Sequence, residues 1–226
     1  MKYFVVGGGS GGHLTPLLAV AKAIKNKDKT ATITHVGQKG DNLQDIVEDS
    51  TIDTTRLLTA GKFRRYHGES FFSHLVDIKT IALNVRDFFK FLAGLIQAWI
   101  LLGKEKPDVI FLKGGFVCVP VGYAARLRRV AYITHDSDAV PGLANRLTAK
   151  HAVFNTTALA AELYPYKQHK TIQVGIPVQS AYSLVSKEDK TKARKKLQVP
   201  DKTDVILSVG GGLGDRRLNK AVVVAV

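Results

Sequence analysis

The stretch Met1-Lys2-Tyr3-Phe4-Val5-Val6-Gly7-Gly8-Gly9-Ser10-Gly11-Gly12-His13-Leu14-Thr15-Pro16 opens the chain and decides its fold. Its apolar residues predict a short buried strand over 3–6 that leads into five glycines, and residues 17–24 predict the helix that follows. Glycine lets the backbone come close to a ligand. The first N–H groups of a helix are unpaired and lie at its positive end. The stretch therefore predicts a site for an anion, with His13 at its mouth.

Composition limits the class of protein. A chain of 226 residues suffices for one large domain, or for one domain and part of another. Its formal charge of +14 predicts anionic partners such as phospholipid headgroups or phosphorylated substrates. Nucleic acid is not an expected partner, because no nucleic-acid motif is present. The single cysteine, Cys118, excludes an internal disulfide framework and fits a reducing compartment. Because the chain enters a strand at once, we expect no signal peptide.

Strands and helices alternate along the chain. Further strands are predicted over 31–37, 52–58, 107–113, 130–134 and 152–155. Further helices are predicted over 41–48, 121–127, 143–148 and about 158–163, with two helical stretches within 71–102 that join near Arg86 and Asp87. This order predicts an α/β fold: a doubly wound, Rossmann-like parallel sheet covered by helices on both faces.

The apolar run over 88–103 is a candidate membrane span. It is shorter than the ~20 apolar residues that spanning requires, and Lys90 and Gln97 interrupt it. These two residues are seven apart and so share one helix face. We expect a mostly buried helix; the alternative is a helix that partly faces lipid. The preceding segment 62–66 mixes Lys62, Arg64 and Arg65 with aromatic residues, which favours an anionic membrane surface.

A second unit is predicted after residue 175. Gly-Ile-Pro at 175–177 indicates a linker, and a basic helix is expected over 187–196. A strand over 204–209, glycines over 210–214 and a helix from about Arg216 then repeat the opening pattern. We therefore divide the chain into a first domain, 1–175, and a linker with the beginning of a second domain, 176–226. One strand and two helices cannot bury a core, so we expect either a fragment or a segment that packs onto something else.

Three features follow strands directly, and ligands bind at the carboxyl ends of strands in open α/β sheets. They are residues 7–13, the second glycine turn 114–116 and the polar cluster 135–138. The first matches the dinucleotide pattern G-x-G-x-x-G, which alone is weak. The second strand ends without an acidic residue, although Lys39 suits a phosphorylated ribose, so an NADP-dependent oxidoreductase remains an alternative. The Walker pattern fails, because no Gly-Lys-Ser/Thr follows the loop.

His13 is the main candidate for chemistry. Its imidazole titrates near neutral pH and suits a general base, and a positive helix end keeps it unprotonated. His135 and Asp136 are an acid–base pair, groups that hydrogen-bond to a substrate, or part of a turn capped by Ser137 or Asp138. No ligand-spaced His or Cys partner accompanies them, so we expect no metal site. Cys118 is expected to be a small packed residue.

The same residues resemble, in order and along the whole chain, motifs of the MurG family of glycosyltransferases. Members of this family add N-acetylglucosamine to lipid-linked muramyl pentapeptide. The segments that carry the resemblance are Gly8–His13 with Pro16, Gly114-Gly115-Phe116 with Pro120, His135-Asp136-Ser137-Asp138 with Asn145, Val174–Val178, and Gly210–Arg216 with Asn219.

The resemblance implies a GT-B glycosyltransferase of family 28 that inverts configuration, with UDP-N-acetylglucosamine as donor substrate and no cofactor or metal. It implies that His13 is the catalytic base and that the protein is peripheral, at the cytoplasmic face of the plasma membrane. The acceptor, including its pyrophosphate, is assigned to Gly9, Ser10, Gly11, Gly12, Gly114, Gly115, Phe116, His135, Asp136, Ser137, Asp138 and Asn145. The donor UDP-sugar is assigned to Gly211, Gly212, Gly214 and Arg216.

The chain also departs from the family pattern. His-Asp-Ser-Asp replaces His-Glu-Gln-Asn at 135–138, Phe116 replaces a tyrosine, Val119 a small residue and Gly212 a serine. Most of the donor domain has no counterpart, so we expect weak donor binding and no turnover by the chain alone. The alternative within this architecture is a non-catalytic, membrane-anchoring, acceptor-binding subunit whose donor domain is supplied by another chain.

Overall fold

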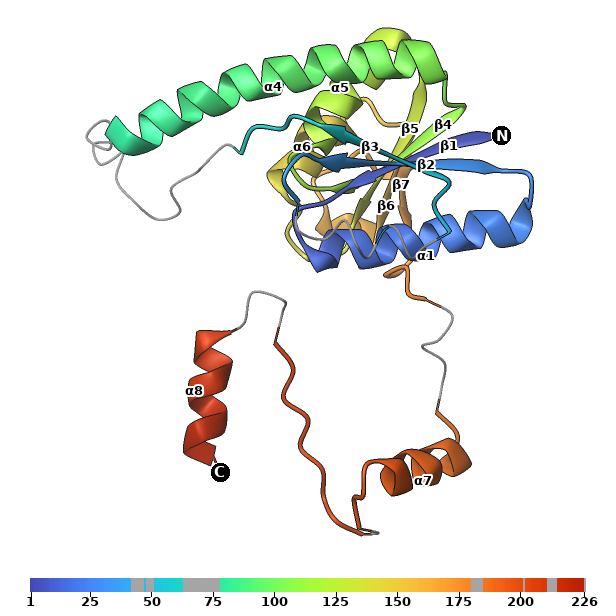
Figure 1. The fold of residues 1–226 in the computed structure, drawn as a ribbon, viewed down its shortest axis with the longest axis vertical. Coiled ribbons are helices and arrows are strands. Elements are labelled where there is room, and N and C mark those ends of the chain that lie inside the picture. Colours follow the sequence, from blue (N-terminus) through green and yellow to red (C-terminus); the bar gives the residue numbers. More distant parts are fainter. Residues whose placement is uncertain are drawn as a thin grey trace. The chain divides into compact units, whose positions relative to one another are not determined.

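Seven parallel strands form one sheet in the order β3-β2-β1-β4-β5-β6-β7 (Figure 1). The computed structural model describes residues 1–41, 47, 51–62, 78–179, 185–200, 202–210 and 215–225. The strands are β1 (Lys2–Gly7), β2 (Thr32–Gln38), β3 (Thr54–Leu58), β4 (Val109–Gly114), β5 (Ala131–Asp136), β6 (Phe154–Thr157) and β7 (Thr171–Gln173). The predicted α/β fold with a parallel sheet is confirmed, and β7 is a strand that the sequence pattern did not predict.

Helices cover both faces of the sheet (Figure 1). Helix α1 (Gly11–Lys27) packs on one face, where it buries Leu14 and Leu17 against Val5. The other face carries α4 (Ile78–Glu105), α5 (Cys118–Arg128) and α6 (Leu143–Ala149). Two short 3₁₀ helices, Ala161–Leu163 and Gln168–Lys170, follow β6. The predicted helix over 41–48 lies almost wholly outside the described residues.

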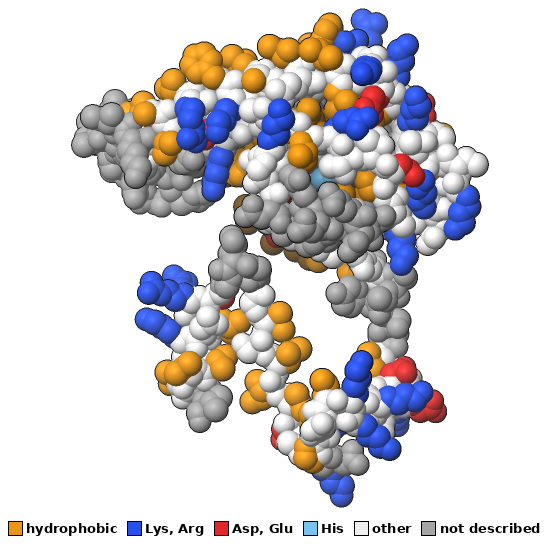
Figure 2. Space-filling view, viewed as in Figure 1, with side chains coloured by type: hydrophobic (Ala, Val, Ile, Leu, Met, Phe, Trp, Pro, Cys, Tyr) orange, Lys and Arg blue, Asp and Glu red, His pale blue; other side chains and the backbone are white. Residues whose placement is uncertain are grey.

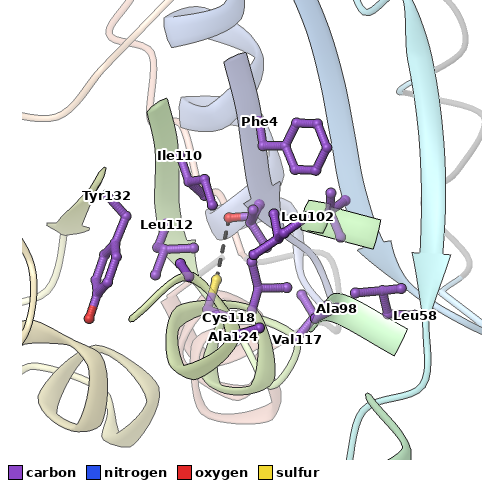
Figure 3. Close-up of a cluster of buried hydrophobic side chains, with 14 of the residues drawn as sticks. Phe4, Leu58, Ala98, Leu102, Ile110, Leu112, Val117, Cys118, Ala124 and Tyr132 are labelled. Atoms are coloured by element: carbon purple, nitrogen blue, oxygen red, sulfur yellow. Dashed lines mark hydrogen bonds between the residues drawn. The ribbon is translucent and has the colours of Figure 1, made fainter. Parts of the chain in front are cut away.

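The larger core cluster lies beneath α4 and α5 (Figure 3). It packs Phe4 of β1 and Ile110 and Leu112 of β4 against Leu102 of α4. Cys118, at the start of α5, is fully buried, and its thiol contacts the carbonyl oxygens of Val6 (3.3 Å) and Gly114 (3.1 Å). Burial raises the pKa of this thiol to about 12. Cys118 is thus the packed residue that was expected.

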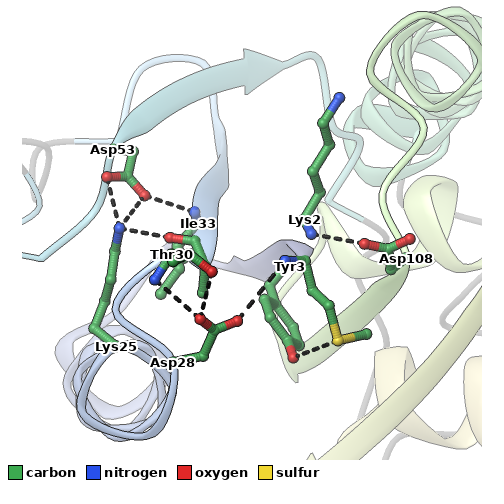
Figure 4. Close-up of polar contacts among 10 residues, drawn as sticks. Lys2, Tyr3, Lys25, Asp28, Thr30, Ile33, Asp53 and Asp108 are labelled. Atoms are coloured by element: carbon green, nitrogen blue, oxygen red, sulfur yellow. Dashed lines mark hydrogen bonds and ion pairs between the residues drawn. The ribbon is translucent and has the colours of Figure 1, made fainter.

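Polar contacts hold the amino ends of the strands together, at the edge opposite the glycine turns (Figure 4). The backbone N–H of Lys2 donates to Asp108 at 2.7 Å and joins the starts of β1 and β4. Asp53, just before β3, accepts from the N–H of Ile33 at 2.7 Å and pairs with Lys25 of α1 at 2.8 Å. These contacts fix the strand starts and leave the carboxyl edge to the glycine turns.

Helix α4 differs from the prediction in two ways. It runs unbroken through Arg86 and Asp87, where two helices were expected to join, and buried Asp87 pairs there with Arg86 at 2.9 Å; residues 71–77 lie outside the described part. It is also not mostly buried, because Gln97 faces the sheet and bonds to Thr59 while many apolar residues face outward. The outward residues, which we call the α4 stripe, are Ile81, Val85, Phe88, Phe89, Leu92, Ile96, Trp99 and Ile100. Among the described helices, none has the length and apolar character needed to cross a membrane.

The chain divides into two compact units, Met1–Gln179 and Ser180–Val226. The second contains α7 (Lys187–Lys196), which begins with a capping box between Ser186 and Asp189, and α8 (Arg216–Ala225). Both helices start where the sequence predicts. The predicted strand over 204–209 is wrong: this segment is irregular, and Ile206 and Leu207 are 95% and 82% exposed. A strand needs a neighbour for its backbone hydrogen bonds, and the described part of the second unit contains no strand.

Candidate active site

The first glycine loop places His13 at a helix start. β1 ends at Gly7, Ser10 in extended conformation is the N-cap, and α1 begins at Gly11, six residues earlier than predicted. His13 is therefore the third residue of the helix. The loop amides are not all available to a ligand, because the N–H of Gly9 donates to the carboxylate of Asp41 at 2.6 Å. Gly11 and Gly12 occupy the first two helix positions, whose N–H groups have no partner within a helix.

The second glycine turn packs directly against the first. Gly114 and Gly115 have φ angles of +127° and +92°, which L side chains rarely adopt. A Cβ atom on Gly115 would lie 2.7 Å from the carbonyl oxygen of Gly8, and one on Gly114 would lie 3.1 Å from Nε2 of His13. The two turns therefore touch only because both residues are glycine, and their contact brings His13 to the end of β4.

The imidazole of His13 is held in one orientation. Its Nδ1 atom lies 3.2 Å from the carbonyl oxygen of Gly8 and 3.0 Å from Oγ of Ser10. A carbonyl oxygen only accepts, so the contact with Gly8 requires the hydrogen on Nδ1 and leaves the lone pair on Nε2. Burial, and next the positive charge of Lys113, lower the pKa of His13 below its ordinary 6.5. The neutral, basic form of the ring is thus favoured at neutral pH.

A cavity of about 340 Å³ opens beside this histidine. Five of the predicted residues line it, namely Gly9, Ser10, His13, Gly115 and Phe116. One wall carries a positive charge, since Nζ of Lys62 lies 5.8 Å from the centre of the Phe116 ring. The other lining residues are Gly8, Gly61, Lys62, Phe91, Val119, Gly142, Leu143, Ala144 and Leu147. The cavity combines a glycine backbone, a base and an apolar side, and the predicted residues Gly11, Gly12, Gly114 and Asn145 do not line it.

The polar cluster 135–138 lies behind this cavity, and its members do not line it. His135 is fully buried between Thr156 (3.0 Å) and Ser137 (3.3 Å), and burial lowers its pKa to about 4. The backbone carbonyl of Asp138, whose residue is exposed, accepts from Tyr164 at 2.9 Å.

Asp136, 3% exposed, accepts a hydrogen bond from Asn145 at 2.7 Å and one from Tyr166 at 2.6 Å. Asp136 and His135 are thus each bonded to other residues. The same amide of Asn145 also donates to the backbone carbonyl of His135 at 2.9 Å. Asp136 and Asn145, both assigned to the acceptor by the resemblance, lie within hydrogen-bonding distance of one another, and Tyr166 is a partner that the sequence did not predict.

Lys113 is the residue at this site that sequence reasoning missed. It stands at the end of β4, directly before the glycine turn, and is only 3% exposed. Burial lowers the pKa of its ammonium, while the carboxylates of Asp136 and Asp138 act to raise it. The signal was present in the sequence, because Lys113 interrupts an otherwise apolar strand immediately before two glycines.

The predicted donor residues lie apart from this cavity in the chain. Gly211, Gly212 and Gly214 are outside the described residues, and Arg216 is the exposed first residue of α8 in the second unit. Within the described ranges, no group of three His, Cys, Asp or Glu side chains is arranged to hold a metal ion. The expectation of a metal-free reaction stays a prediction.

Comparison with known proteins places the first unit in a family. Residues 3–154 match the model of the glycosyltransferase family 28 N-terminal domain. The chain is 35% identical over 98% of its length to the UDP-N-acetylglucosamine–N-acetylmuramyl-(pentapeptide) pyrophosphoryl-undecaprenol N-acetylglucosamine transferase of Clostridium botulinum, and covers 56% of it. It is 36% identical, again over 98% of its length, to transferase 2 of that name from Bacillus anthracis, and covers 57% of it. The chain thus spans about half the length of the curated relatives it matches.

A solved structure supports the fold. The crystal structure of MurG from Acinetobacter baumannii superposes with a TM-score of 0.59 at 20% identity, over 81% of this chain and 48% of that one. The match to the family model over residues 3–154 agrees with the order of the strands and with the two glycine turns at the carboxyl edge of the sheet. The chain belongs to glycosyltransferase family 28.

Proposed function

We propose that the first unit is the acceptor-binding part of an inverting N-acetylglucosaminyltransferase of peptidoglycan precursor synthesis. Its donor is UDP-N-acetylglucosamine and its acceptor a lipid-pyrophosphate-linked muramyl pentapeptide. The names of the curated relatives support this choice of substrates. The observation that carries the proposal is the free Nε2 of His13 beside a cavity formed by two glycine turns.

In this proposal His13 is the general base. Its Nε2 takes the proton from the acceptor hydroxyl, whose oxygen attacks the anomeric carbon of N-acetylglucosamine. The bond from that carbon to the diphosphate breaks, and UDP leaves with the electron pair. A single displacement inverts the anomeric centre and leaves the proton on His13. A positioned base of this kind contributes roughly 10²–10⁴-fold to the rate.

The acceptor pyrophosphate is assigned to the glycine turns. The N–H groups of Gly11 and Gly12 lie at the positive end of α1, which attracts anions. Lys62, on the cavity wall, adds a charge of the same sign. Because Asp41 occupies the N–H of Gly9, the phosphates are assigned to the helix start and not to the whole loop.

The donor site belongs to a second domain in this proposal. Gly211, Gly212, Gly214 and Arg216 begin that site, and the remainder is supplied either by a longer form of this chain or by a separate chain. The exposed apolar segment 204–209 supports this, because it has the composition of a buried strand and its side chains are uncovered. We expect no transfer by the 226 residues alone.

The α4 stripe is assigned to the membrane that carries the acceptor. Figure 2 shows hydrophobic side chains along the outer side of α4, with Lys and Arg side chains beside them. Arg86 and Lys90 are exposed on the same helix, and Arg128 stacks over Trp99 at 3.7 Å. Apolar residues flanked by cations suit an anionic leaflet. We propose peripheral attachment to the cytoplasmic face of the plasma membrane.

The test separates acceptor binding from transfer. Calorimetry with the full chain compares a short-chain prenyl-pyrophosphoryl muramyl pentapeptide with the same muramyl pentapeptide lacking the prenyl-pyrophosphate. We expect the first to bind at least tenfold more tightly, and equal binding would contradict the pyrophosphate assignment. Transfer of labelled N-acetylglucosamine is then measured after the donor half of the Bacillus anthracis relative is joined to this chain. His13→Gln should lower kcat by roughly 10²-fold or more without weakening acceptor binding.

A further inference from the structure

The side chain of Lys113 lies almost wholly inside the protein, since the residue is 3% exposed. Within the described residues its Nζ has no hydrogen bond and no ion pair within 4 Å, and this end of the side chain keeps some access to solvent. A buried ammonium is costly unless opposite charges lie near it. The carboxylates of Asp136 and Asp138 are the charges that favour its protonated form. The charge of Lys113 is therefore favoured by Asp136, the last residue of β5, and by Asp138, two residues later.

The sheet brings Lys113 and His13 to the same place. Gly7 pairs with Gly114 across β1 and β4, and a Cβ on Gly7 would lie 3.4 Å from Cβ of Lys113. Gly114, the next residue, is the one whose Cβ would lie 3.1 Å from the His13 ring. Lys113 and His13 thus lie on either side of Gly114, and the positive charge of Lys113 acts on the imidazole.

Opposing influences act on the carboxyl group of Asp136. Burial is the largest and raises its pKa above the ordinary value. Hydrogen bonds from Tyr166 and Asn145, and then the charge of Lys113, act against burial and favour the charged form. The charges of Lys113 and Asp136 thus affect one another, and both act on the imidazole of His13.

We propose that Lys113 is a positioning residue of the transfer reaction, whose ammonium keeps His13 neutral until it receives the acceptor proton. Asp136 and Asp138 hold that ammonium in place, and they stabilise the imidazolium once the proton has moved. The inference rests on the proposed role of His13 as base. It predicts that removing the charge of Lys113 and removing the charge of Asp138 shift the pKa of His13 in opposite directions.

Other charged and titratable groups also lie near His13. The cavity wall contributes Lys62 and the loop after β2 contributes Asp41, and neither is altered in the variants below. Burial, and next the charge of Lys113, lower the pKa of His135 to about 4. The ring signals of His135 are therefore followed beside those of His13 in each variant.

The experiment titrates His13 in the full chain by NMR of its ring, assigned by comparison with His13→Gln. Lys113→Met removes a cation that disfavours imidazolium, so the pKa of His13 should rise by about 0.5–1.5. Asp138→Asn removes an anion that favours imidazolium, so the pKa should fall. Lys113→Arg retains the charge, and Lys104→Met removes an exposed cation at the far end of α4; neither should move the titration.

The joined transferase described above provides the second measurement. The acid limb of the kcat/KM profile should move to higher pH in Lys113→Met and to lower pH in Asp138→Asn. An unmoved titration in folded Lys113→Met, or a titration that moves while the acid limb does not, would overturn the proposal. Should Lys113→Met fail to fold, Lys113→Gln takes its place, because it also removes the charge and should likewise raise the pKa of His13. Failure of the proposed function is seen separately, as full transfer by His13→Gln.

Discussion

The Nδ1 atom of His13 lies 3.2 Å from the carbonyl oxygen of Gly8, five residues earlier in the chain. The glycine loop therefore bends back upon the first turn of the helix that it introduces. The loop has two functions in this arrangement: it exposes the amides at the helix start, and it fixes which ring nitrogen of His13 carries the hydrogen. Ser10, the N-cap, adds a second contact to the same nitrogen at 3.0 Å.

The first prediction concerns the tautomer of His13. Because Gly8 offers only a carbonyl oxygen, the neutral ring should carry its hydrogen on Nδ1 and its lone pair on Nε2. Ring ¹⁵N chemical shifts of the labelled chain above pH 7 report this directly. Ser10→Ala should keep the same tautomer, since the contact with Gly8 remains. A neutral ring protonated at Nε2 would contradict the assignment of that atom as base.

Apolar runs next to glycines made β1, β4 and most of the parallel sheet predictable, because buried strands are recognised by composition. The prediction starts α1 at residue 17, whereas the helix begins at Gly11. Glycines are poor helix formers, so Gly11 and Gly12 do not indicate a helix, although Ser10 is a suitable N-cap residue. The strand β7 has only three residues and forms because β6 offers it an edge. The segment 204–209 shows the reverse, since an apolar run without a neighbour stays irregular.

In the candidate active site, too, features set by local sequence were predictable and features set by the tertiary fold were not. Residues adjacent in sequence, such as the glycine turns and His13, were identifiable because each follows a strand directly. Tyr166, which donates to Asp136 from thirty residues away, was not, because only the fold brings the two together. The environment of His135 was equally hidden: its burial between strands is a tertiary property that no local pattern encodes.

A second prediction tests the contact between the glycine turns. Gly115→Ala should destabilise the chain by about 1–3 kcal/mol, because φ of +92° is strained for alanine and its Cβ would meet the carbonyl of Gly8. Gly11→Ala is the matched control, since its Cβ would meet no atom within 4 Å. Urea unfolding at pH 7.5 compares the two variants. Equal stability of both would show that the turns do not pack as described.

The third prediction concerns Cys118, the one cysteine of the chain. Burial raises the pKa of its thiol to about 12, and thiolate is the reactive form. Ellman's reagent at pH 8 should therefore leave the native chain unmodified over the time in which urea-unfolded chain reacts completely. Rapid labelling of the native chain would mean that α5 opens readily at its first turn.

The fourth prediction addresses the α4 stripe. Replacing both Phe89 and Ile96 by serine should lower binding to phosphatidylglycerol vesicles at least tenfold, because each exposed apolar side chain contributes roughly 1.5–3 kcal/mol when fully buried in an apolar phase. Cosedimentation measures the effect. Leu163→Ser, which alters an equally exposed leucine outside α4, is the control and should bind as the unaltered chain does. Comparable losses in both variants would remove the stripe as the attachment surface.

The last prediction is a pH dependence of stability caused by His135. Its pKa is about 4 in the folded chain against an ordinary 6.5, so the unfolded chain binds the proton more tightly. The stability that neutral His135 provides is complete above pH 6.5 and is lost as the pH falls from 6.5 toward 4. The full difference amounts to roughly 3 kcal/mol. Asp136, whose pKa burial raises, acts in the opposite direction. His13, His35 and His151, whose pKa values are lowered, act in the same direction as His135.

A comparison of variants isolates this contribution. Urea unfolding at pH 7.5 and pH 5 should show a smaller pH-dependent loss in His135→Gln than in the unaltered chain, because glutamine keeps polar atoms near Thr156 but does not titrate. His169→Gln is the control, since His169 is exposed and should leave the pH dependence unchanged. The same loss in His135→Gln as in the unaltered chain would place the titrating group elsewhere. In that case His135 would not be the buried neutral base at the end of β5 that its contacts indicate.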